Sequence, residues 1–236
     1  TPTAPTVTTP SSLTGTYVGS SVQTSPAGSP QYLEFSLTQS GTSVSGTFAV
    51  LPNGSQTGGF GTLSGSLSGS ALALTGTNTF GNTCTNTINA TASGALILGT
   101  FAVSGGSGCT GSGTFSAQLQ TFTVPSVAGN YSGTVTQVGT SGTMTMTITQ
   151  SGAFFSGSAT LTFPSNPSMN GSGQFVGFIS NATTAQFTVL PGGGNQSCAP
   201  FGTVTINGNQ LTASFSGSST GNGNCNGTGT FTVTHS

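Results

Sequence analysis

Apolar and polar residues alternate in short segments along most of the chain. Met144, Met146 and Ile148 alternate with threonine, and Leu72 and Leu74 alternate with Ala and Thr in the same way. Alternation with a period of two is typical of a β-strand that buries one face. Gly and Asn residues separate the segments, as tight turns require. The pattern predicts an all-β protein of short strands.

The chain carries the same series of segments twice, in the same order. In a chain so rich in Ser, Thr and Gly a single match means little, but an ordered set that includes the cysteines indicates a tandem repeat. The matched pairs are 15–19 (GTYVG) with 129–133 (GNYSG), 36–41 (SLTQSG) with 147–152 (TITQSG), Ser45-Gly46 with Ser156-Gly157, and 111–115 (GSGTF) with 227–231 (GTGTF).

The repeat predicts two tandem antiparallel β domains, each with about eight strands. We place an extended Pro/Thr-rich arm at 1–10, the first domain at 11–122, a linker at 123–128 and the second domain at 129–236. Alternation alone is compatible with a barrel-like meander and with an immunoglobulin-like or jelly-roll sandwich. The prevalence of tight turns between neighbouring segments favours the barrel.

Charge is almost absent from this composition. The chain has no Lys or Arg, and Glu34 and His235 are its only acidic and imidazole side chains. Without cations it cannot neutralise phosphates, which excludes nucleic acids and anionic membrane surfaces as main partners. No apolar run reaches the roughly 20 residues of a spanning helix, so we expect no membrane span. The mean hydropathy of +0.11 and the sixteen Phe argue against disorder.

The same composition removes most catalytic chemistry, because acid–base and nucleophilic mechanisms need titratable groups in proximity. Residues 217–221 (GSSTG) fit a nucleophile-elbow pattern, but they stand in a Gly/Ser-rich stretch with no acid downstream. We expect Glu34 to be an outward, solvated carboxylate, and we assign no role to the penultimate His235. The sequence therefore predicts no enzyme, no cofactor and no metal site.

The four cysteines divide evenly between the copies. Cys84 and Cys109 lie in the first copy, and Cys198 and Cys225 lie in the second. The repeat favours one disulfide in each domain, Cys84–Cys109 and Cys198–Cys225, over the alternative of four buried thiols. Disulfides indicate a secreted or surface protein.

Aromatic residues offer little for a carbohydrate platform, since the chain has no Trp. Tyr17 and Tyr131 occupy equivalent repeat positions, which indicates a structural role for both, and Tyr32 remains a weak candidate. A Phe-lined barrel would still be able to hold an apolar ligand.

Acceptor patterns for N-linked glycans are about as frequent as this composition alone would produce, so their number is no sign of glycosylation. Glycans nevertheless remain candidate partners at these positions, which are Asn53, Asn89, Asn130, Asn170, Asn181, Asn195 and Asn226.

An uncharged β surface favours association, because like charges normally keep soluble proteins apart. The formal net charge of this chain is −1. We therefore expect the chain to bind copies of itself head to tail, either by end-to-end stacking or by donation of a strand from the arm. The arm residues are Thr3, Ala4, Pro5, Thr6, Val7 and Thr8.

Segments such as LTGTY, TQSGTSVSGTF and GSGTF, with a cysteine pair late in each copy, resemble Ser/Thr/Gly-rich tandem β domains of secreted bacterial surface proteins. The two-domain layout with a Pro-rich arm looks like that of subunits of extracellular pilus-like fibrils. These resemblances imply a structural or adhesive role and supply no catalytic residues. The leading hypothesis is thus an extracellular, self-assembling structural subunit, and the alternative is a secreted or surface-anchored β-barrel binding or adhesion module.

Overall fold

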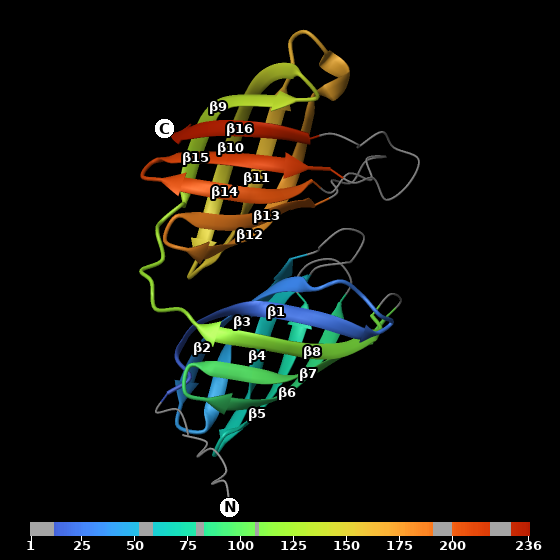
Figure 1. The fold of residues 1–236 in the computed structure, drawn as a ribbon, viewed down its shortest axis with the longest axis vertical. Helices are drawn as coiled ribbons and strands as arrows, with labels where there is room; N and C mark the ends of the chain where they lie inside the picture. The colour runs from blue at the N-terminus through green and yellow to red at the C-terminus, as the bar shows by residue number, and fades with distance from the viewer. Residues whose placement is uncertain (1–11, 52–58, 79–82, 107–108, 191–199, 218–227) are drawn as a thin grey trace, which may run out of the picture. The chain divides into compact units, whose positions relative to one another are not determined.

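β-Strands make up most of the protein in the computed structural model, which describes residues 12–51, 59–78, 83–106, 109–190, 200–217 and 228–236 (Figure 1). The chain divides into two units, 1–121 and 122–236. The strands of the first unit are β1 (Gly15–Ser25), β2 (Gln31–Ser40), β3 (Ser43–Leu51), β4 (Gly59–Ser68), β5 (Ala71–Asn78), β6 (Cys84–Ser93), β7 (Leu96–Gly105) and β8 (Gly111–Leu119). Those of the second are β9 (Gly129–Gln137), β10 (Thr140–Ser151), β11 (Phe154–Thr162), β12 (Gly171–Asn181), β13 (Thr184–Leu190), β14 (Phe201–Asn207), β15 (Gln210–Ser216) and β16 (Thr228–His235), with the short 3-10 helix η1 (Pro167–Met169) before β12.

Each unit is a closed antiparallel barrel. Every strand pairs with its neighbours in sequence, and the first strand of each unit pairs with the last, β1 with β8 and β9 with β16. The prediction of two all-β domains of about eight strands is confirmed, and the barrel is the architecture present. Turns such as 41–42 and 152–153 are too short to carry the chain across to a second sheet, so the strands follow one another around a single twisted sheet that closes.

The repeated Thr-Gln-Ser-Gly motif closes one end of each barrel. In the first barrel the Oε1 atom of Gln39 accepts a hydrogen bond of 2.7 Å from the backbone N–H of Leu13. In the second, Oε1 of Gln150 accepts one of 2.7 Å from the N–H of Val127. Leu13 and Val127 are both buried within the core of their own barrel. The glutamine therefore holds a hydrophobic plug in the barrel end.

The glycine of that motif makes the following turn. Gly41 has φ of 61° and Gly152 has φ of 62°, a left-handed conformation that glycine adopts without steric cost. The side-chain Nε2 of each glutamine also donates to the carbonyl oxygen of its turn glycine, at 2.8 Å and 2.9 Å respectively. One short motif thus fixes both the hairpin turn and the plug.

Other glycines face the barrel interior and let the strands curve. A Cβ atom on Gly46 would overlap the carbonyl oxygen of Ser36 on the neighbouring strand, and one on Gly157 would overlap that of Thr147. These are the equivalent Ser-Gly positions of the repeat. Glycine at such points permits the sharp strand bending that a small closed barrel needs.

The interior of each barrel is filled by the inward half of the alternating pattern. In the first barrel this half includes Phe35, Phe48 and Phe115, and in the second it includes Met144 and Phe175, all of them buried. Burial of such side chains contributes roughly 25 cal/mol for each Å² of apolar surface removed from water. The core thus lies inside each barrel, and the outer faces carry mainly Ser and Thr.

We predict that Gly157→Ala destabilises the protein by about 3 kcal/mol, because the added methyl group forces backbone apart where strands β10 and β11 approach. Gly171→Ala is the matched control, since a Cβ there meets nothing within 4 Å. Urea denaturation of both variants measures the difference. Equal stabilities for the two variants would show that the close approach is not what requires glycine at position 157.

Candidate functional site

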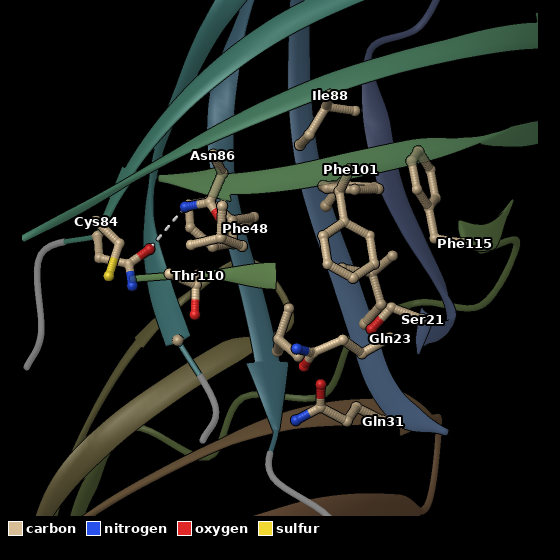
Figure 2. A pocket seen from close by; sticks show the side chains of 16 residues that line it. Ser21, Gln23, Gln31, Phe48, Cys84, Asn86, Ile88, Phe101, Thr110 and Phe115 are labelled. Atoms are coloured by element: carbon tan, nitrogen blue, oxygen red, sulfur yellow. Dashed lines mark hydrogen bonds between the residues drawn. The ribbon is translucent and has the colours of Figure 1, made fainter. Parts of the chain in front are cut away.

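The first barrel contains a cavity of about 120 Å³ at the end where β1 finishes and β2 begins. This is the end opposite to the one that Gln39 closes, because Gln39 lies at the far end of β2. Side chains from all around the barrel line the space, and Figure 2 shows them from close by. The lining residues are Ser21, Gln23, Gln31, Leu33, Phe35, Phe48, Val50, Gly59, Asn78, Cys84, Asn86, Ile88, Phe101, Val103, Thr110 and Phe115.

Aromatic and aliphatic side chains form the inner part of the cavity. Phe35 and Phe115 meet edge to face, with ring centroids 5.3 Å apart and an interplanar angle of 72°. Phe48, Phe101 and Ile88 line the same space (Figure 2). Each occupies an inward position of its strand, so the alternation that builds the core also builds this apolar surface.

Neutral polar side chains form the remaining part. Every second residue of a strand faces the barrel interior, and we call this series the inward track of the strand. On β2 the inward track runs from Gln31 to Leu33 and Phe35. On β6 it runs from Cys84 through Asn86 to Ile88. The Nδ2 atom of Asn86 donates a hydrogen bond of 2.8 Å to Oδ1 of Asn78. The cavity therefore combines an apolar body with an amide-bearing region, the combination that small-molecule sites commonly show.

No charged side chain takes part in this site. Glu34 and His235 are the chain's only ionisable acid and imidazole, both lie in the described structure, and neither lines the cavity. The absence of Lys, Arg and Asp is a property of the whole sequence. Any ligand here is recognised by shape, apolar contact and neutral hydrogen bonds.

A disulfide borders the cavity. Cys84, the first residue of β6, is bonded to Cys109, which precedes Thr110 and β8. This is the pairing expected for the first domain, and it closes a loop with a sequence separation of 25, which stabilises the fold by roughly 3 kcal/mol through the unfolded state. The bond also fixes two of the lining residues, Cys84 and Thr110, relative to each other. Cys198 and Cys225 lie outside the described residues.

The described residues of the second barrel enclose a much smaller internal space. Its cavity measures about 30 Å³, and its lining residues are all apolar, among them Met144, Met146, Phe155, Phe187 and Phe231. Flexible methionine side chains fill irregular gaps between aromatic rings well. The two copies of the repeat therefore share a fold, but the internal spaces formed by their described residues differ in volume and in polarity.

The remaining candidate residues lie away from the cavity. Tyr17 and Tyr131 are buried inside their respective barrels, whereas Tyr32 is 47% exposed. His235 is the last residue of β16 and packs edge-on against Tyr131 at 5.1 Å. The arm residues 3–8 and most of 217–221 lie outside the described residues, as do Asn53, Asn195 and Asn226. The other glycan-acceptor asparagines, Asn89, Asn130, Asn170 and Asn181, are exposed.

Glu34 differs from the expectation. Its side chain does point away from the barrel interior, since its neighbours Leu33 and Phe35 point inward, but only 1% of its surface is exposed. Ala49, its partner on β3, is buried on the same outer face. Neither carboxyl oxygen has a hydrogen-bond partner among the described residues. Burial raises the pKa of Glu34 to about 8, so the expected solvated carboxylate is wrong.

Sequence reasoning missed the polar part of the cavity. The alternation of the sequence did not single out the amide side chains that line the cavity, although part of their pattern was visible in it. These residues are Gln23, Gln31, Asn78 and Asn86. At Gln31-Tyr32-Leu33-Glu34-Phe35 the inward track begins with an amide before it turns apolar. A polar residue that continues an inward track at a strand end indicates a polar barrel mouth.

Among the described residues, no helix is long and apolar enough to span a membrane. In the same part of the chain no group of three or more His, Cys, Asp or Glu side chains is placed to hold a metal ion.

Comparisons with known proteins assign no family. No family model and no curated protein matches the chain. Solved structures with distant similarity include a protein of unknown function of the DUF3598 family from Nostoc punctiforme, with a TM-score of 0.32 and 11% identity over 95% of this chain and 96% of that one. A second structure, described as that of a proposed outer membrane protein from Bacteroides fragilis, has a TM-score of 0.31 and 12% identity over 94% of this chain and 97% of that one. A third, transferrin binding protein B from serogroup B Neisseria meningitidis, has a TM-score of 0.29 and 10% identity over 87% of this chain and 66% of that one.

We predict that the stability of the protein falls as pH rises from about 4.5 to about 8. Burial keeps Glu34 protonated in the folded state up to a pKa of about 8, whereas the unfolded chain releases that proton near the ordinary value of 4.5. The folded state therefore binds the extra proton in this window, and the free energy of unfolding decreases with pH by up to about 1.4 kcal/mol per pH unit.

Glu34→Gln removes this titration and is expected to be more stable than the wild type at pH 8, with a flat profile across the window. Urea denaturation of both proteins at several pH values measures the effect. Parallel profiles for wild type and variant would contradict the assignment of the pH dependence to Glu34.

Proposed function

We propose that the first barrel is a binding module for a small, largely apolar organic molecule, and that binding involves no chemical step. The observation that carries this proposal is the cavity of about 120 Å³ in the first barrel, whereas the cavity found among the described residues of the second barrel measures about 30 Å³. Eight-stranded barrels have interiors just wide enough to hold their own side chains or one small ligand.

The size of the cavity limits the ligand. Engineered apolar protein cavities of about 150 Å³ bind benzene. A space of about 120 Å³ lined by Phe35, Phe48, Phe101 and Phe115 therefore suits a molecule with the dimensions of a single six-membered ring. A second cavity of about 30 Å³ is too small for such a ring.

The setting that we propose for this binding is the cell surface or the extracellular space. The Cys84–Cys109 disulfide supports it, because such bonds persist in oxidising compartments. The uncharged composition adds support, since a chain without Lys or Arg offers no cleavage site to trypsin-like proteases. We expect a secreted or surface-anchored module.

The test is a titration with benzene followed by NMR or calorimetry. We expect saturable binding to the wild-type protein. Val103→Phe places a ring at an inward, partly buried lining position and is expected to weaken binding at least tenfold. Leu98→Phe is the control on the same strand, since Leu98 is 47% exposed on the outer face. Absence of binding to the wild type, or equal loss in both variants, would overturn the proposal.

A second candidate function is head-to-tail self-assembly into an extracellular filament. It is favoured by the formal net charge of −1 over 236 residues, because surfaces without mutual repulsion associate readily. Strand donation by the arm would need an open sheet edge, and the described strands form closed barrels, which have none. End-to-end stacking, with contacts from the arm at residues 1–10, is the form of assembly that we propose.

Deletion of residues 1–10 is expected to abolish filaments that the full-length chain forms at high concentration. Negative-stain microscopy of the two proteins, prepared in parallel without glycans, gives the answer. Filaments of unchanged length from the shortened chain would exclude the arm, and dispersed particles from the full-length chain would exclude assembly.

A further inference from the structure

The cavity of the first barrel has a polar region that defines which head group its ligand carries. We propose that the paired amides of Asn78 and Asn86 bind an uncharged hydrogen-bonding group, such as a hydroxyl or carboxamide, and that the barrel rejects carboxylate and ammonium forms of the same molecule. This inference rests on the proposed function of the first barrel and specifies the ligand class.

The two asparagines hold each other in place. Asn86 lies on the inward track of β6 and Asn78 is the last residue of β5, the neighbouring strand. The 2.8 Å hydrogen bond from Nδ2 of Asn86 to Oδ1 of Asn78 joins two partly buried side chains. A side chain fixed before binding loses less conformational entropy when the ligand arrives.

The mutual bond leaves hydrogen-bonding capacity for a ligand. A side-chain amide has two N–H donors and a carbonyl oxygen with two lone pairs. One donor of Asn86 and one lone pair of Asn78 are used in the pair. As far as the described residues show, the pair therefore offers the carbonyl oxygen of Asn86 as an acceptor and the N–H₂ group of Asn78 as a donor. A hydroxyl or carboxamide, which both donates and accepts, matches this set.

Charged head groups bind less favourably in this cavity than neutral ones. An ion that leaves water for a partly buried site loses favourable hydration, and the loss is large unless an opposite charge compensates it. The chain has no Lys, Arg or Asp to supply that charge. Glu34 points to the outer face of β2, and His235 belongs to the other barrel. Neutral amides alone do not compensate a full charge.

The apolar and polar regions lie in one cavity. Phe48, Ile88, Phe101 and Phe115 line the same space as Asn86 (Figure 2). Asn78 lines it as well. A ligand with a ring-sized apolar body and a polar substituent therefore matches the two kinds of side chain that line this one cavity. The ligand class is a small neutral molecule with one apolar ring and one polar head.

The experiment compares probes that share one body and differ in head group. Benzene carries no head, benzyl alcohol and benzamide carry neutral heads, and benzoate and benzylammonium are charged at pH 7. We expect the neutral-headed probes to bind the wild type at least tenfold more tightly than either charged probe, and more tightly than benzene. Binding is measured by calorimetry or by NMR titration.

Asn86→Leu is expected to remove the advantage of benzyl alcohol over benzene while leaving benzene binding in place. Asn86→Asp is expected to strengthen the binding of benzylammonium at least tenfold relative to that of benzyl alcohol, because the variant adds the missing counter-charge. Asn89→Leu, at an exposed position on the same strand, is the control and should leave the whole series unchanged.

The outcomes separate this inference from the function on which it rests. If benzene itself does not bind, the proposed function fails. If benzene binds but benzyl alcohol gains nothing over it, or benzoate binds as well as benzamide, the head-group inference is overturned and the binding module stands.

Discussion

A closed barrel of eight strands has room inside for little more than its own inward-facing side chains. The size of the inward-facing side chains therefore decides how much internal space each barrel keeps. In the second barrel the inward tracks supply Met144, Met146 and several phenylalanines, which leave about 30 Å³. In the first barrel the tracks end in amides and hydroxyls around phenylalanine rings, which leave about 120 Å³. Small changes at inward positions of one repeat thus separate a nearly filled core from one with an open cavity.

The near-absence of charged residues limits the interactions available inside and outside both barrels. Because the chain has one acidic residue, one histidine and no Lys or Arg, the interior and the outer face must both rely on neutral groups. Gln39 and Gln150 illustrate this, since the neutral amide of each accepts a backbone hydrogen bond at a barrel end. The burial of Glu34 leaves the chain with a carboxyl group that is neutral over most of the physiological pH range. Recognition of a neutral ligand is consistent with this chemistry.

Much of the fold could be predicted from sequence because periodicity and repetition report backbone geometry directly. Alternation at Met144, Met146 and Ile148 places all three inside the second barrel, and short turns such as the one at Gly41 favour a meander. The cavity was harder to predict, because the sequence shows that Asn86 follows an inward track but not how much space surrounds it. The burial of Glu34 was not predictable for a similar reason, since alternation gives the face of a side chain and not what covers that face.

Within the described part of the chain the larger internal space lies in the first barrel, where we propose that a ligand binds, and dissolved xenon probes this difference between the barrels. Xenon enters apolar cavities without needing any polar contact. In methyl-resolved NMR of the wild-type protein, we expect xenon-induced shifts at Ile88, Val50 and Val103 in the first barrel, with Met144, Ile148 and Ile206 in the second unchanged. Shifts of equal size in both barrels, or shifts confined to the second, would contradict this expectation.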